Sequence, residues 1–172
     1  MSRPDALLGP FDPLRALRVL LDHGVRFVLI GGLAGRVLGS PSVTNDLDIC
    51  YARDRPNLGS LAEALVELGA RLRGSPVDVP FLLDAQSLAN GMNFSFATDA
   101  GALDCLGLPA GVAGYDELAR GAEALDLDGT AVLVCSLDDL IRMKLAAARR
   151  KDLIEAEVLG ALREERNHRP RR

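Results

Sequence analysis

The segment that most constrains this chain joins a short apolar run, a double glycine and an Asp-x-Asp motif. The run Phe27–Ile30 (FVLI) predicts a buried strand, residues 33–38 a short helix, and Asp46–Tyr51 a second strand. Alternate side chains of a strand share a face, so Asp46 and Asp48 point to the same side, about 6–7 Å apart. Two carboxylates at this spacing can bridge a pair of divalent ions, as a two-metal phosphoryl-transfer site requires.

The double glycine directly before the helix predicts a phosphate-binding turn. Gly31 and Gly32 free backbone N–H groups to approach phosphate oxygens at a helix start. Neither the dinucleotide-binding G-x-G-x-x-G motif nor the P-loop G-K-S/T motif occurs, because Gly31, Gly32 and Gly35 have a different spacing. A bare glycine pair more often marks a tight strand–helix turn, but the T-x-D-x-D motif that follows favours phosphate binding. One stretch therefore supplies both halves of a site for a metal–nucleoside triphosphate.

The carboxylates of the motif are candidate metal ligands. Leu47 and Ile49 alternate with Asp46 and Asp48, so both carboxylates lie on one face of an otherwise buried strand, which is costly without cations. A third carboxylate is expected from a neighbouring strand, and Asp104 is the lone charge in the apolar run 102–106. Asp104 would be a metal ligand or the base that takes a proton from an attacking hydroxyl. The alternative for Asp104 is a charge at a strand end.

Lys144 is expected on the core-facing stripe of a helix that starts at Ser136. The apolar residues that mark this stripe are Leu137, Leu140, Ile141, Leu145 and Ala148. A lysine on the buried side needs an anion, either a triphosphate or a catalytic carboxylate, unless its stem carries the ammonium to the surface. Asp152 is expected to cap the N-terminus of a last helix, or else to contact the site.

Composition places the chain among ordinary soluble domains. It has 172 residues, 48% hydrophobic and 26% charged, and a net charge of −4, so we expect one domain over residues 1–166 and a disordered basic tail over 167–172. Aromatic residues make up 4% and Trp is absent, which argues against a base-stacking surface. No apolar run approaches the roughly 18 residues of a membrane span, and residues 1–8 lack the apolar stretch expected of a signal peptide. A cytoplasmic protein with no membrane partner is the expectation.

Charge is distributed unevenly along the chain. Residues 142–172 hold ten basic and five acidic residues, a net charge of +5, which leaves −9 for the rest of a chain whose total is −4. A basic end on an acidic body would suit a polyanionic acceptor, although a solvated helix face with an Arg-rich tail gives the same pattern. Cys50, Cys105 and Cys135 form no C-x-x-C motif and are expected to be reduced core residues.

The remaining pattern predicts helices and strands in mixed order. Helices are expected over residues 12–24, 57–68, 115–121, from 136 onward, and from 152 to about 166. Strands are expected over 70–73, 93–98, 102–106, 124–127 and 131–135, the last two around an Asp128-Gly129 turn. Residues 74–90 carry no clear pattern, since Ser75-Pro76 and Val79-Pro80 interrupt it.

Taken together, these motifs resemble the DNA polymerase β-like nucleotidyltransferase superfamily, and most closely its AbiEii-type toxin branch. The resemblance rests on Gly31-Gly32, Gly39-Ser40 and Thr44–Ile49, on Leu103–Leu106, and on Ser136–Lys144 followed by Arg150-Lys151-Asp152. It implies an α+β fold: a mixed β-sheet with flanking helices and a helical C-terminus. It also implies two Mg²⁺ ions and transfer of a nucleoside monophosphate from an NTP, with release of pyrophosphate. Relatives often carry a basic residue where this chain has Ser42.

The resemblance assigns roles and leaves the acceptor open. Asp46 and Asp48 would hold the two Mg²⁺, Asp104 would complete the metal site or activate the acceptor hydroxyl, and Lys144 would take part in catalysis. Nucleotide contacts would come from Gly31, Gly32, Ser40 and Thr44. Toxin members modify the acceptor end of tRNA and pair with an antitoxin protein, whereas distant relatives adenylylate antibiotics. The expected function is therefore a tRNA-modifying nucleotidyltransferase toxin, with a small-molecule nucleotidyltransferase or a non-catalytic nucleotide-binding module as alternatives.

Overall fold

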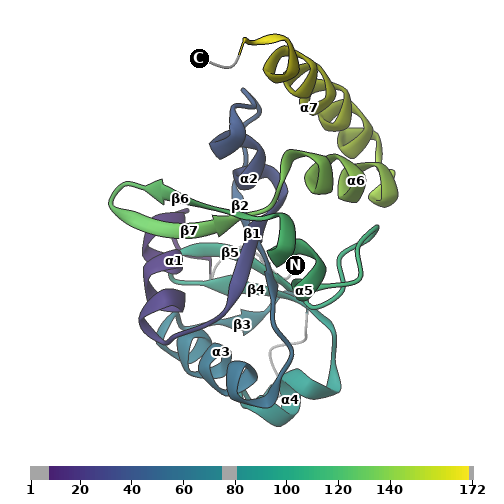
Figure 1. Ribbon diagram of the computed structural model, residues 1–172. Coiled ribbons are helices and arrows are strands. Elements are labelled where there is room, and N and C mark those ends of the chain that lie inside the picture. The colour runs from purple at the N-terminus through teal and green to yellow at the C-terminus, as the bar shows by residue number, and fades with distance from the viewer. Residues whose placement is uncertain (1–7, 75–80, 171–172) are drawn as a thin grey trace, which may run out of the picture.

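A seven-stranded mixed sheet forms the centre of the computed structural model, which describes residues 8–74 and 81–170. The strand order is β3-β4-β5-β2-β1-β7-β6 (Figure 1). β2 runs parallel to β5 and antiparallel to β1, and β1 runs parallel to β7. The strands are β1 (Phe27–Ile30), β2 (Asp46–Tyr51), β3 (Arg71–Leu72), β4 (Asn93–Thr98), β5 (Gly101–Leu106), β6 (Glu123–Leu127) and β7 (Thr130–Val134). The predicted α+β fold with a mixed sheet is confirmed.

Helices flank the sheet and form the C-terminal end. They are α1 (Pro13–Asp22), α2 (Gly31–Leu38), α3 (Arg55–Glu67), α4 (Ala85–Asn90), α5 (Tyr115–Gly121), α6 (Leu137–Ala147) and α7 (Arg150–His168). α4 lies in the stretch without a clear sequence pattern, of which residues 75–80 lie outside the described part. α6 and α7 pack on each other beside the sheet (Figure 1). No helix of the described residues is long and apolar enough to cross a membrane.

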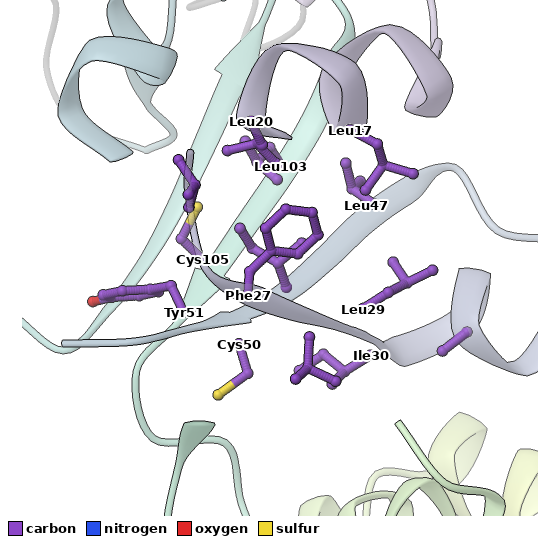
Figure 2. Packing of buried hydrophobic residues seen from close by; sticks show 14 of the residues in the cluster. Leu17, Leu20, Phe27, Leu29, Ile30, Leu47, Cys50, Tyr51, Leu103 and Cys105 are labelled. Atoms are coloured by element: carbon purple, nitrogen blue, oxygen red, sulfur yellow. The ribbon is translucent and has the colours of Figure 1, made fainter. Parts of the chain in front are cut away.

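The central strands separate an apolar face from a face that carries the carboxylates. Side chains alternate along β1, β2 and β5, and one set packs with Leu17 and Leu20 of α1 (Figure 2). This buried set includes Phe27, Leu29, Leu47 and Leu103. By the same alternation Asp46, Asp48 and Asp104 share the opposite face. The three cysteines are buried and free, as predicted, and burial raises the pKa of the Cys50 and Cys135 thiols to about 12.

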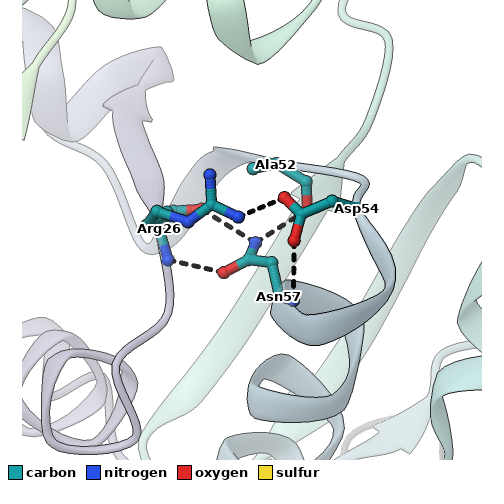
Figure 3. Close-up of polar contacts among 4 residues, drawn as sticks. All are labelled: Arg26, Ala52, Asp54 and Asn57. Atoms are coloured by element: carbon teal, nitrogen blue, oxygen red, sulfur yellow. Dashed lines mark hydrogen bonds and ion pairs between the residues drawn. The ribbon is translucent and has the colours of Figure 1, made fainter.

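A polar network fixes the junction between β2 and α3. The buried Asn57 accepts a hydrogen bond from the Arg26 backbone N–H at 2.7 Å and donates to the carbonyls of Arg26 and Ala52 at 3.1 and 2.7 Å (Figure 3). Asp54 caps the helix by accepting from the Asn57 N–H at 3.1 Å. The helix therefore begins at Arg55, two residues before the predicted start.

The break between α6 and α7 differs from the prediction. α6 begins as expected, because the Ser136 hydroxyl accepts from the Asp139 N–H at 3.0 Å. It ends at Ala147 with Ala148 as its C-cap, whose φ of +56° is left-handed, and α7 starts at Arg150 with Arg149 as its N-cap. Asp152 therefore lies in the first turn of α7 and is not the cap.

Two further details of these helices depart from the sequence analysis. Leu145, predicted on the core-facing stripe of α6, is 54% exposed, and Ala148 is exposed as well, while Met143 is buried. The predicted stripe was too wide, since Leu137, Leu140 and Ile141 already cover the buried side. α7 continues to His168, two residues past its predicted end, so the first two residues of the predicted tail are helical.

Candidate functional site

The double glycine brings the start of α2 against the Asp48 carboxylate. Gly31 has a φ of +70°, and a Cβ at this position would lie 2.0 Å from Asp48 Oδ2. A Cβ on Gly32 would lie 2.9 Å from the Thr44 side chain. The glycines belong to the first turn of α2 and do not precede it, so their N–H groups are among those that a helix leaves without intrahelical partners. The sequence therefore needs glycine at both positions.

The pairing of β2 with β5 brings Asp48 and Asp104 side by side. The two residues are register partners on adjacent parallel strands, which lie about 4.8 Å apart. Asp46, two residues earlier on β2, faces the same side. Oδ1 of Asp104 is buried and has no hydrogen-bond partner among the described residues. The predicted third carboxylate is thus directly beside the doublet.

This arrangement makes the site electrostatically costly when nothing positive is bound. Burial is the largest cause that raises the pKa of Asp48, to about 7, and the charge of Asp104 is the next. Asp46 raises it further, whereas Lys144 lowers it. Two adjacent, partly buried carboxylates that repel each other favour a bound cation.

Two basic side chains of the α6–α7 junction pair with Asp152 and line the same pocket as Asp48 and Asp104. Lys144 Nζ lies 3.6 Å from Asp152 Oδ1, and Arg149 donates from Nε to Asp152 Oδ2 at 2.6 Å. Asp152 is 1% exposed. Burial alone would raise the pKa of Asp152, but the Arg149 hydrogen bond and the two positive charges outweigh burial and lower it. Asp152 therefore contacts the site residues, the second of the roles considered for it, and holds both cations in place.

A two-lobed pocket opens at these charges. The lobe that we call the cationic lobe has a volume of about 390 Å³ and is lined by Gly32, Ser42–Thr44, Asp46, Asp48, Asp104, Lys144, Arg149, Lys151, Ile154 and Glu155. The lobe that we call the apolar lobe has about 260 Å³ and is lined by Ile30, Gly31, Asp48, Asp104, Leu106, Pro109, Ala110, Leu140, Met143, Lys144, Ala147, Arg149 and Asp152. The lobes meet at Asp48, Asp104, Lys144 and Arg149. The predicted residues Gly31, Gly32, Thr44, Asp46, Asp48, Asp104 and Lys144 all line one lobe or both.

Ser40 lies away from the pocket lining. Its hydroxyl is buried and donates to Glu155 Oε1 at 2.9 Å, and its oxygen accepts from the Ser42 N–H at 3.2 Å. Ser42 also donates its hydroxyl to Glu155. A direct nucleotide contact of Ser40 stays a prediction, since this hydroxyl is engaged with Glu155. Ser42 lines the cationic lobe.

Two residues of the site, Arg149 and Glu155, were not singled out from the sequence. Arg149 was counted with the basic C-terminal segment. Its spacing of three residues from Asp152 could have indicated an ion pair between the two side chains. The contacts of Glu155 could not be recognised from local spacing, because its partners Ser40 and Ser42 are more than 110 residues away in the sequence. Only the folded chain brings them together.

The carboxylates fit Mg²⁺ with respect to ligand chemistry. Within residues 8–74 and 81–170, no group of three or more His, Cys, Asp or Glu side chains is arranged to hold a metal ion. Mg²⁺, however, is usually bound through one or two carboxylates together with substrate phosphates and water. Asp46, Asp48 and the unpaired oxygen of Asp104 provide such oxygen ligands beside a lobe suited to phosphates.

Solved structures share this architecture. No protein-family model matches the sequence, and no curated protein matches it. The lincomycin-bound lincosamide antibiotic adenylyltransferase LnuA superposes with a TM-score of 0.57 at 13% identity, over 87% of this chain and 94% of that chain. The chain has the nucleotidyltransferase fold. The antibiotic-resistance factor ANT(2'')-Ia, in solution, gives a TM-score of 0.53 at 17% identity over 90% of each chain. Its complex with adenylyl-2''-tobramycin gives 0.53 at 18% identity over 89% of this chain and 95% of that chain.

Proposed function

We propose that this protein is a metal-dependent nucleotidyltransferase that moves a nucleoside monophosphate from an NTP to a hydroxyl acceptor. The observation that carries the proposal is the Asp48–Asp104 register pair, which faces a pocket lined by Lys144, Arg149 and Lys151. The fold shared with adenylyltransferases adds support. Carboxylates for metal and cations for phosphate, side by side, suit phosphoryl transfer.

The cationic lobe would bind the triphosphate. Lys144, Arg149 and Lys151 supply positive charge, and the backbone N–H groups at the start of α2 offer hydrogen-bond donors to phosphate oxygens. Asp46 and Asp48 would hold two Mg²⁺, with Asp104 as a further ligand. When bound, these ions would neutralise phosphate charge and align the α-phosphate. Asp152 keeps Lys144 and Arg149 oriented toward this lobe.

Asp104 would receive the proton of the acceptor. In the reaction the acceptor oxygen forms a bond to the α-phosphorus, the bond between that phosphorus and the bridging oxygen to the β-phosphate breaks, and pyrophosphate leaves with the electron pair. The proton of the attacking hydroxyl passes to a carboxylate oxygen of Asp104, which has an oxygen without a hydrogen-bond partner among the described residues. Most of the rate enhancement would come from positioning and charge neutralisation.

The placement of the basic residues favours a small-molecule acceptor over tRNA. Four arginines of the segment 142–172 pair with carboxylates: Arg142 with Glu117 and Asp139, Arg149 with Asp152, Arg163 with Asp138, and Arg169 with Glu165. Such pairing reduces the positive field that a polyanion would meet. The tRNA-modifying toxin with an antitoxin partner therefore stands as the second candidate, supported by the AbiEii-like motifs.

Labelled-nucleotide transfer tests the function and separates the acceptors. Each α-³²P-labelled NTP is incubated with Mg²⁺, the protein and either total tRNA or a low-mass cell extract, with Asp104→Asn as the inactive variant. We expect label in a low-mass product and equimolar pyrophosphate, both lost in Asp104→Asn. Label in tRNA, with binding that weakens steeply as salt rises, would instead favour the toxin. Tight NTP binding without turnover on either acceptor pool would favour the nucleotide-binding module.

A further inference from the structure

The apolar lobe is a second compartment at the reacting carboxylates. It shares Asp48, Asp104, Lys144 and Arg149 with the cationic lobe. From there it extends over the end of β5 and over α6, whereas the cationic lobe extends over residues 42–44 and α7. Its distinctive wall is formed by Leu106, Pro109, Ala110, Met143 and Ala147. A compartment of this lining binds uncharged surface better than phosphate.

The wall of this lobe is held in place by contacts within the protein. The loop after β5 lies so close to α6 that a Cβ on Gly111, whose φ is +84°, would be 2.7 Å from the Ala146 Cβ. Glu117 of α5 accepts a hydrogen bond from the Ala113 N–H at 2.5 Å and one from Arg142 of α6 at 2.6 Å. These contacts join the loop to both helices, so the lobe is formed before a ligand enters.

Charges in the apolar lobe leave little for a polycation or a polyanion to bind. Asp152 is already paired with Lys144 and Arg149. The other acidic lining residues are Asp48 and Asp104, which serve the reaction itself, and the rest of the lining is uncharged. An acceptor with several amino groups would find no further carboxylate in this lining, and a phosphate backbone would find no further cation. The class of acceptor that fits this lining is an uncharged hydroxyl compound with an apolar face.

The in-line geometry of transfer assigns the lobe to the acceptor. The leaving pyrophosphate carries the most charge and needs the cationic lobe, because Lys151 lines that lobe alone, while Lys144 and Arg149 lie where the two lobes meet. The attacking hydroxyl must approach the α-phosphorus from the opposite side. We propose that the apolar lobe binds the acceptor, and that the acceptor is a small uncharged hydroxyl compound with an apolar face. This inference rests on the proposed function, because it places the acceptor relative to the triphosphate.

Glycosides that differ in their apolar part test the lobe. Calorimetry in Mg²⁺ compares methyl, butyl and phenyl β-D-glucopyranoside, with kanamycin as a polycationic amino sugar, on the full chain. Two variants, Ala147→Phe and Ala110→Phe, place a phenyl ring in the lobe from residues that are exposed. The matched control is Ala161→Phe, at an exposed residue of α7 outside the lobe. Binding of each Mg–NTP is measured on the same four proteins.

The affinity for the glucosides is expected to rise with the size of their apolar part. Affinity should rise at least tenfold from the methyl to the phenyl glucoside, and at least one lobe-filling variant that folds as the wild type should lose that gain, while Ala161→Phe keeps it. Mg–NTP affinity should stay within threefold in all variants. Equal affinity for the three glucosides, tighter binding of kanamycin, or an undiminished gain in both filled variants would overturn the proposal. Loss of Mg–NTP binding on filling would assign the lobe to the nucleotide and overturn it as well. Absence of NTP binding or transfer in the wild type would refute the proposed function separately.

Discussion

Replacing Asp48 by Asn should stabilise the metal-free protein while abolishing its activity. Asp48 is partly buried next to Asp104, and both its burial and the charge of Asp104 raise its pKa from 3.8 to about 7. An asparagine has nearly the same shape but no charge to bury. The site thus has a cost in stability that its proposed chemistry requires.

The magnitude follows from linkage between protonation and folding. The folded state binds the Asp48 proton more tightly than the unfolded state, so its stabilising contribution is complete below pH 3.8 and is lost as pH rises through about 7. At pH 7 the full shift corresponds to at most about 4 kcal/mol of lost stability. Since Asp48 borders a pocket that water enters, we expect Asp48→Asn to gain about 1–3 kcal/mol.

Urea unfolding from pH 4 to 8, in EDTA and in Mg²⁺, measures the effect. In EDTA the free energy of unfolding of the wild type should fall between pH 4 and 7, and this slope should be much smaller in Asp48→Asn. Mg²⁺ should raise the stability of the wild type and have little effect on the variant. The exposed Asp22→Asn serves as control and should follow the wild type. An Asp48→Asn protein that is less stable than the wild type at pH 7 in EDTA would refute the argument from buried charge.

Three further predictions concern glycine, loop and helix-junction positions. Gly31→Ala should reduce transfer at least a hundredfold, because its Cβ would overlap Oδ2 of Asp48. The control Gly59→Ala has open space around it in α3, so it should keep activity and gain about 0.5–1 kcal/mol in the free energy of thermal unfolding. Glu155→Ala should lose about 1–3 kcal/mol and raise the KM for NTP, since two serine hydroxyls of the loop lose their acceptor; the exposed Glu157→Ala should change neither quantity. Asn57→Ala should lose about 3 kcal/mol in urea unfolding but keep the NTP affinity of the folded protein, because its three backbone partners lie at the β2–α3 junction; a large change in affinity would contradict this.

Local pattern was enough to predict most elements and to select the carboxylates that the structure brings together. The run 27–30, the doublet strand 46–51 and the Asp128-Gly129 hairpin follow from alternation and turn residues, and the structure has all of them. Asp104 could be selected because it is the one charge in an apolar strand. Boundaries such as the start of α3 were less accurate, since they depend on which of several nearby residues caps the helix.

The sequence alone determined the chemical groups that the candidate site offers: three carboxylates on strands, a glycine pair at a helix start, and a lysine on the core-facing side of a helix. The tertiary structure decided how these groups meet. The parallel register places Asp48 opposite Asp104, and the break at Ala148 turns Asp152 into a buried partner of Lys144 and Arg149. Register and helix junctions depend on contacts between residues far apart in the chain, such as Glu155 with Ser40, which no local pattern encodes. The division of the pocket into two lobes arises in the same way, because its walls come from β5, α6, α7 and the loop after α2 together.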